Sequence, residues 1–277
     1  MPDSTFPDKF LLPDLVSHCP YSLRLNPNCN DVARASERWL LAGANHNQAK
    51  ANAFMGLQAG ELTAACYPDA NPFRLRVCSD FMNYLFNLDD WLDEFDVIDT
   101  NGMADCCITA LRNPHTFKTD KAAGKMSKSY VILINNFVFQ VQHLLFFISF
   151  FSRFLKDGGQ GCAERFIHTM ELFFKAVAQQ SADRTQGWIP DLESYVPIRR
   201  DTSGCKPCFA LIEYAAGIDL PAQVIDHPTI RALEEATNDL VTWSNVRQFL
   251  SLTADASPLL RIYSHTVSSE RGATRTT

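Results

Sequence analysis

Five carboxylates lie within eight residues, at the end of an otherwise apolar segment: Asp89, Asp90, Asp93, Glu94 and Asp96. In a helix, the i, i+4, i+7 spacing places Asp89, Asp93 and Asp96 on one face. Asp90 lies about 100° further round such a helix. Like charges at this spacing destabilise a helix, and negative charge near its C-terminus is disfavoured by the helix dipole. Such a cluster is tolerated in two situations. Either water solvates the carboxylates at an exposed helix end, or a bound cation supplies the opposite charge. Mg²⁺ is the natural candidate because it prefers hard oxygen ligands.

The residues just before the acidic cluster favour the cation. They are aromatic or apolar, and include Phe81, Met82, Tyr84, Leu85, Phe86 and Leu88. The carboxylates are therefore expected at the rim of an apolar region. Proteins often hold Mg²⁺ with one or two carboxylates together with substrate phosphates. A cleft of this kind suits a small-molecule substrate that combines a hydrophobic body with a diphosphate.

Nine cysteines are the other residues that could do chemistry. The first ten residues, MPDSTFPDKF, lack the basic and apolar regions of a secretory signal, so we expect a cytoplasmic protein with reduced thiols. Cys205 and Cys208 have CxxC spacing, but a zinc site needs a second ligand pair, and none lies at a convincing distance. We therefore interpret the cysteines as structural.

The elements that must position these residues are helices. Four stretches mix good helix formers or repeat apolar residues at three- and four-residue steps: 33–57, 75–96, 163–181 and 228–245. Alternating apolar and polar residues, which are typical of strands, are hardly visible. The chain of 277 residues is therefore predicted to be all-α and to form one domain.

Charge and composition restrict the function classes. Apolar residues make up 46% of the chain, which excludes a long disordered protein. The net charge is −6 and the isoelectric point about 5.6. A nucleic-acid binder usually carries a basic surface, so we expect no nucleic-acid partner.

Two stretches depart from the helical pattern. Residues 129–152 carry no charged side chain, and their length would allow a transmembrane helix. Asn135, Asn136 and other polar residues inside the stretch argue against this, so we expect no membrane partner. Residues 246–277 lose the helical periodicity and end in a Ser/Thr/Arg-rich run, which is typical of a disordered tail.

Several motifs resemble one family. Asp89-Asp90-x-x-Asp93 at a helix end is similar to the DDxxD metal motif of class I terpene synthases. The surrounding segment CSDFMNYLFNLDDWLDEFD resembles basidiomycete fungal sesquiterpene synthases. So do FLLPDLVSHCPYSLRLNP near the start, YVPIRRDTSGCKP around Arg199, and NDLVTWSN at 238–245. The likeness covers most of residues 10–128 and 151–245.

The resemblance implies an antiparallel helical bundle around an apolar cavity. At its mouth, three Mg²⁺ ions would bind the diphosphate of farnesyl diphosphate, which ionises and cyclises with loss of diphosphate. Asp89 would be the main metal ligand, assisted by Asp93 or Asp90. Arg199 occupies the position of the family's diphosphate-sensing arginine, and its guanidinium suits phosphate. Asp89 and Arg199 are thus the candidate catalytic residues.

The family's second metal motif, Asn-Asp-x-x-Ser-x-x-x-Glu, matches only in part. One register begins at Asn238 and reaches Val246 where the family has glutamate. The other begins at Asn245, which lies 46 residues after Arg199, the separation that we associate with the family. We favour Asn245 as a metal ligand, although Phe249 and Thr253 then replace the serine and the glutamate.

The same resemblance predicts the domain organisation. A terpene synthase domain is expected over residues 1–245, with a foreign apolar insert at about 130–150, followed by an unrelated tail at 246–277. The fold is then C-terminally truncated, and we hypothesise that both foreign segments are translated introns. Two functions remain open: a magnesium-dependent sesquiterpene synthase, or an inactive family member that retains at most weak metal or diphosphate binding.

Overall fold

The computed structural model describes residues 19–44, 46–113, 116–118 and 150–252. Every regular element in these residues is a helix, which confirms the all-α prediction. The helices are α1 (Cys29–Ala44), α2 (Gln48–Met55), α3 (Ala59–Cys66), α4 (Pro72–Asp93), α5 (Val97–Arg112), α8 (Phe150–Phe154), α9 (Gln160–Gln186), α10 (Leu192–Thr202), α11 (Cys205–Ala216), α12 (Ala222–Ile225) and α13 (Pro228–Leu252). The predicted insert and most of the predicted tail lie outside the described residues.

The predicted helix boundaries differ from the structure. Helix α4 ends three residues before the predicted residue 96, and α9 continues five residues past the predicted residue 181. The helical stretch expected at 33–57 is divided into α1 and α2. The division falls before Asn47, whose side chain accepts a hydrogen bond from the Lys50 amide and so caps α2. At the other end of the chain, α13 continues to Leu252, past the end expected at residue 245.

Helix α4 lies at the centre of the fold and carries the acidic cluster. Asn71 caps its first turn and Pro72 occupies a position where a missing amide is harmless. Helices α1, α3, α8 and α11 pack against it, and most of its residues are buried. The helix ends at Asp93, so its last turn holds the carboxylates.

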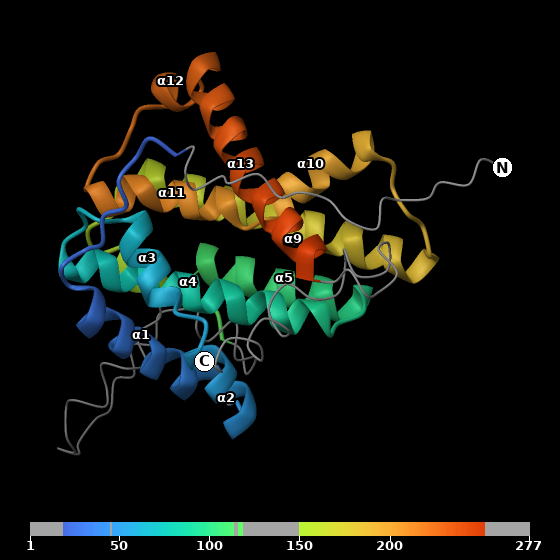
Figure 1. Cartoon of the computed structure of the whole chain (residues 1–277), viewed down its shortest axis with the longest axis horizontal. Helices are drawn as coiled ribbons and strands as arrows, with labels where there is room; N and C mark the ends of the chain where they lie inside the picture. Colours follow the sequence, from blue (N-terminus) through green and yellow to red (C-terminus); the bar gives the residue numbers. More distant parts are fainter. Residues whose placement is uncertain (1–18, 45, 114–115, 119–149, 253–277) are drawn as a thin grey trace.

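The second layer is built around α9, which packs against α5, α10 and α11. Figure 1 shows α4 and α5 in one layer, α9, α10 and α11 in the next, and α13 crossing the second layer. Helix α13 contacts α10 and α11, while its first turns extend away from the bundle together with α12. The C-terminal part of α13 is thereby directed toward the carboxylate end of the bundle.

An aromatic core joins the two layers. Phe81 of α4 lies edge-on to Phe166 of α9, with ring centroids 4.9 Å apart. Phe154 of α8 stacks on Tyr214 of α11 at 4.4 Å. All four rings are almost completely buried. This rigid packing fixes the relative positions of the helices that carry the candidate site.

A buried ion-pair group fixes α8 to α4. The fully buried carboxylate of Asp80 pairs with Arg76 one turn earlier and with Arg153 of α8.

Within the described part of the chain, no helix is long and apolar enough to cross a membrane. Residues 129–149 of the uncharged stretch lie outside that part.

Candidate functional site

The last turn of α4 presents two carboxylates on one face. Asp89 is half-buried and Asp93, one turn later, is exposed. Burial and the nearby Asp93 charge raise the pKa of Asp89 to about 7, against the opposing effect of Arg199. The ionised pair is therefore under-compensated by the protein itself. This is the electrostatic condition in which a bound cation stabilises a carboxylate site.

Two basic side chains from the second layer face these carboxylates. Arg184, near the end of α9, places its Nη1 atom 3.9 Å from Oδ1 of Asp93. Arg199, near the end of α10, lowers the pKa of Asp89 through its charge, and Arg184 does the same more weakly. Carboxylates and guanidiniums thus meet at one end of the bundle, from three different helices.

Asn245 of α13 joins this group. The Nη2 atom of Arg199 donates to Oδ1 of Asn245 over 3.4 Å. The structure thus brings the first residue of the favoured register beside Arg199. The carboxamide is exposed, so its oxygen is accessible to a ligand.

Asn238, the first residue of the other register, lies in the contact between α10 and α13. Its side chain is buried, donates to the Arg200 carbonyl at 2.9 Å, and accepts from Ser203 at 3.0 Å and Thr242 at 2.9 Å. These bonds occupy both ends of the carboxamide. The structure therefore places Asn238 in a packing role and away from the carboxylates of α4.

The adjacent arginines of α10 have different partners. Arg200 forms two hydrogen bonds of 2.7 Å with Asp239 of α13 and a longer ion pair with Glu235. This bidentate pair fastens α10 to α13. Arg199 instead lies near Asp89 and contacts Asn245.

Asp90 is separated from Asp89 and Asp93. Its Oδ2 atom lies 3.6 Å from Nζ of Lys50 on α2. The 100° offset along the helix turns this side chain toward α2, on the flank of α4 away from α9 and α10. Of the three aspartates proposed as metal ligands from the motif, the structure brings two to the shared face.

Sequence reasoning missed Arg184 and Lys50. A cation near a helix C-terminus is an ordinary stabilising feature, so nothing in the local pattern distinguishes Arg184. Lys50 lies in a helical stretch with no motif of its own. Both residues reach the acidic cluster only through contacts between distant helices, which no local spacing encodes.

The oxygen ligands that the chain offers suit a hard cation whose remaining ligands come from a substrate. In the part of the chain that the structure describes, no three His, Cys, Asp or Glu side chains converge into a complete metal site. The chain instead offers two carboxylates from α4 and an amide oxygen from α13. Mg²⁺ is often bound by few carboxylates together with substrate phosphates and water. The CxxC cysteines, Cys205 and Cys208, are free thiols.

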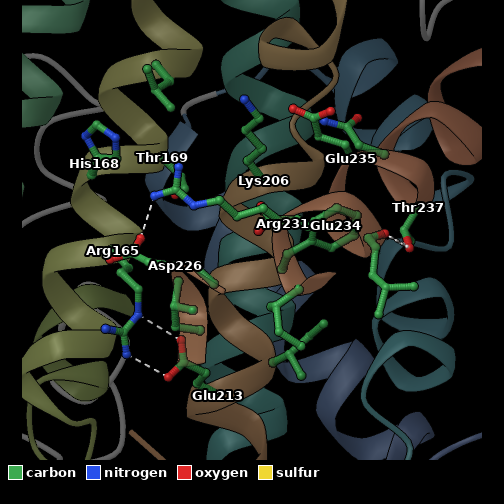
Figure 2. Close-up of a pocket in the computed structure, with 18 of the residues that line it drawn as sticks. Arg165, His168, Thr169, Lys206, Glu213, Asp226, Arg231, Glu234, Glu235 and Thr237 are labelled. Carbon is green, nitrogen blue, oxygen red and sulfur yellow. Dashed lines mark hydrogen bonds and ion pairs between the residues drawn. The ribbon is translucent and has the colours of Figure 1, made fainter. Parts of the chain in front are cut away.

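A separate groove lies between α9, α11, α12 and α13, with a volume of about 700 Å³. Figure 2 shows Arg165 of α9 joined to Glu213 of α11 among the residues that line it. The two hydrogen bonds measure 2.9 and 2.7 Å. Arg231 pairs with Asp226 at its edge. The predicted catalytic and metal-binding residues do not line this groove. Within each of the two pairs, the arginine neutralises its acidic partner.

Comparison with known proteins now identifies the class. Residues 80–245 match the family model described as "Terpene synthase family 2, C-terminal metal binding". This match includes α4 from Asp80 onward, α9, α10 and the part of α13 that reaches Asn245. The chain therefore belongs to the terpene synthase family, and the resemblance drawn from its motifs is confirmed.

Within the terpene synthase family, the chain is similar to sesquiterpene synthases from basidiomycetes. The chain is 48% identical over 244 residues to sesquiterpene synthase 1 of Postia placenta, covering 88% of this chain and 66% of that protein. It is 46% identical to sesquiterpene synthase Agr1 of Cyclocybe aegerita, covering 86% of this chain and 63% of that protein. The chain thus spans slightly less than two thirds of the length of these relatives.

Solved structures show the same fold at low sequence identity. Germacradien-4-ol synthase from Streptomyces citricolor superposes with a TM-score of 0.66 and 19% identity, covering 85% of this chain and 73% of that chain. The ancestral-sequence protein SVS_A2 gives 0.70 at 20% identity, covering 86% of this chain and 68% of that chain. The helical bundle predicted from the family resemblance is therefore confirmed.

Proposed function

We propose that this chain has the site of a magnesium-dependent sesquiterpene synthase, which ionises farnesyl diphosphate and cyclises the resulting carbocation with loss of diphosphate. One observation carries the proposal. Two carboxylates of α4 face two guanidiniums and a carboxamide from α9, α10 and α13. This arrangement suits a cation and a diphosphate bound side by side. The names of the basidiomycete relatives support the substrate class.

Asp89 and Asp93 are the proposed metal ligands on α4, and Asn245 is the proposed ligand on α13. When bound, Mg²⁺ supplies Lewis-acid stabilisation of the diphosphate leaving group. Arg199 binds and orients the diphosphate, because its guanidinium can donate two parallel hydrogen bonds to phosphate oxygens. Asp90 is left out of the ligand set because it pairs with Lys50. The family resemblance suggests three ions.

The apolar part of the substrate requires a lining that excludes water and tolerates positive charge. The residues of α4 that precede Asp89 on the same face are Phe86 and Met82, one and two turns earlier. Aromatic faces stabilise cations electrostatically. We propose that this face of α4 contacts the hydrocarbon chain while the last turn binds the diphosphate end.

We propose that the terpene synthase domain is formed by residues 1–245 and that 246–277 does not contribute to it. The end of the family match at Asn245 supports this boundary. The same boundary favours a second candidate function, a family member that binds metal or diphosphate weakly and does not turn over. In the Asn245 register, Phe249 has no oxygen ligand to replace the serine, and Thr253 offers a neutral hydroxyl in place of the glutamate carboxylate.

Incubation of the purified chain with farnesyl diphosphate, with Mg²⁺ or with EDTA, followed by gas chromatography–mass spectrometry, separates the two candidates. A sesquiterpene formed only with Mg²⁺ supports the synthase. No product, from protein that is folded by circular dichroism and binds Mg²⁺, supports the binding-only candidate. Failure to bind either Mg²⁺ or diphosphate contradicts both. The Asp89→Asn variant is the control for binding at this site.

A further inference from the structure

Lys50 contacts the acidic cluster from the side opposite to the arginines. Its Nζ atom lies 3.6 Å from Oδ2 of Asp90 and 3.5 Å from Oε1 of Glu94. Lys50 and Asp90 expose only 26% and 25% of their side-chain surface. Partial burial weakens solvent screening, so this pair interacts more strongly than an exposed ion pair.

The position of Lys50 is fixed by the packing of α2. Asn47 caps the helix by accepting from the Lys50 amide at 2.9 Å. Phe54 is buried and stacks on His46 with ring centroids 5.0 Å apart. His46 in turn lies 6.4 Å from the ring of Trp91 on α4. Phe54 also belongs to the buried core cluster that includes Leu88 and Leu92 of α4, so the packing of α2 places Lys50 near the last turn of α4.

The last turn of α4 needs a positive charge from elsewhere. Asp89, Asp90, Asp93 and Glu94 lie at its C-terminal end, and the last turn contains no basic residue. Negative charge is unfavourable there, and the i, i+4 pairs Asp89–Asp93 and Asp90–Glu94 repel. Lys50 lies between the members of the second pair and offsets both charges. The two ion pairs therefore reduce the repulsion between Asp90 and Glu94.

We propose that Lys50 is a positioning residue of the metal site, which neutralises Asp90 and Glu94 and so keeps Asp89 and Asp93 aligned on the face that binds the cation. The inference rests on the proposed function, because it takes a metal to bind at Asp89 and Asp93. The ion pairs of Lys50 are with the other two carboxylates. Its effect on the metal ligands therefore passes through the conformation of the last turn of α4.

Titration of the full chain with Mn²⁺ alone, followed by electron paramagnetic resonance of the free ion, tests this without requiring turnover. Lys50→Met is expected to weaken Mn²⁺ binding about tenfold, as is usual for residues that orient metal ligands. Lys50→Arg should restore most of the affinity. The matched control is Arg74→Met. It removes the ion pair of Arg74 with Asp157 at the first turn of α4, far from the acidic cluster in the last turn of that helix.

The outcomes distinguish the inference from the proposed function. If the unaltered chain does not bind Mn²⁺, the metal site is wrong and the inference fails with it. If it binds and Asp89→Asn abolishes binding, while Lys50→Met binds equally or more tightly, only the inference is wrong. Tighter binding would mean that Lys50 acts merely as a repelling charge.

A charge-balanced variant guards against loss of folding in Lys50→Met. The triple variant Lys50→Met, Asp90→Asn, Glu94→Gln removes the lysine together with the two charges that it offsets. The inference expects this variant to bind Mn²⁺ within about threefold of the unaltered chain, since outer residues act by orienting the ligands. Affinity that stays tenfold weak in a folded triple variant would overturn it.

Discussion

At the scale of single residues, adjacent residues of the same type have different roles in the site. Asp89 faces the guanidiniums while Asp90 faces Lys50. Arg199 reaches Asn245 while Arg200 binds Asp239. In each pair, consecutive residues on a helix point about 100° apart, so the same residue type serves binding in one case and packing in the other.

The raised pKa of Asp89 predicts a specific pH dependence of stability. Its folded pKa is about 7, whereas an unfolded aspartate titrates near 3.9. Between these values the folded state binds the additional proton, so this residue's contribution to stability falls as pH rises from about 4 to 7. Asp89→Asn should therefore melt at a higher temperature than the unaltered metal-free chain at pH 8, and the two should converge toward pH 4. A gap that does not change with pH would contradict the assignment.

The two arginines of α10 provide a matched pair for binding and stability. Arg199→Gln should weaken binding of inorganic diphosphate with Mg²⁺ at least tenfold, since a bidentate charged contact is lost. Its melting temperature should change little. Arg200→Gln should leave that affinity intact and cost about 1 kcal/mol, because a half-exposed ion pair is lost. Calorimetric titration and thermal unfolding of both variants check this, and an exchange of the two phenotypes would refute the division.

At the scale of elements, the site depends on how α10 and α13 are joined. Asn238 and Arg200 hold the two helices together at one level. Asn245 extends about two turns further along α13, toward the carboxylates. Helix α13 therefore holds α10 through Asn238 and reaches the candidate site through Asn245, about two turns later.

Alanine substitutions at the two asparagines distinguish these levels. Asn238→Ala removes a buried carboxamide and leaves the Arg200 carbonyl and the Thr242 hydroxyl without it, at a cost of about 2 kcal/mol. Asn245→Ala removes an exposed side chain, so the free energy of unfolding should hardly change, whereas Mn²⁺ or diphosphate binding should weaken. Urea unfolding and metal titration measure the two effects. A large loss of stability in Asn245→Ala would argue against its placement as a ligand.

The elements also show what sequence could and could not predict. Local periodicity predicted α4 and α9, and the spacing of Asp89 and Asp93 was enough to place both on one helix face. The 46-residue separation selected Asn245 over Asn238. The break between α1 and α2, and the contacts of Lys50 and Arg184, depend on packing between helices distant in sequence. Such contacts leave no trace in local spacing.

At the scale of the whole molecule, four helices from separate parts of the chain meet at the carboxylate end. Because α4, α9, α10 and α13 each supply a side chain, a ligand bound there connects both layers of the bundle. Binding to the folded state alone then stabilises the entire fold by mass action.

Thermal unfolding with ligands tests this. Mg²⁺ and inorganic diphosphate together, at a free concentration 100-fold above their dissociation constant, should stabilise the fold by about 2.7 kcal/mol. For a domain of this size, that is a rise in melting temperature of roughly 5–10 °C. Mg²⁺ alone should give a smaller rise, and Asp89→Asn should show neither. A rise that persists in that variant would place binding elsewhere.

The bidentate pair between Arg200 and Asp239 has a mechanical consequence. With Asn238 it joins α10 and α13 at two points, so we expect the two helices to move as a rigid unit. Arg199 lies beside one of these points, and Asn245 lies further along the same unit. A small rotation of this unit that carries Arg199 toward an anion also carries Asn245, because the two side chains lie in contact on the same unit. Recognition of the anion and presentation of the carboxamide become a single movement.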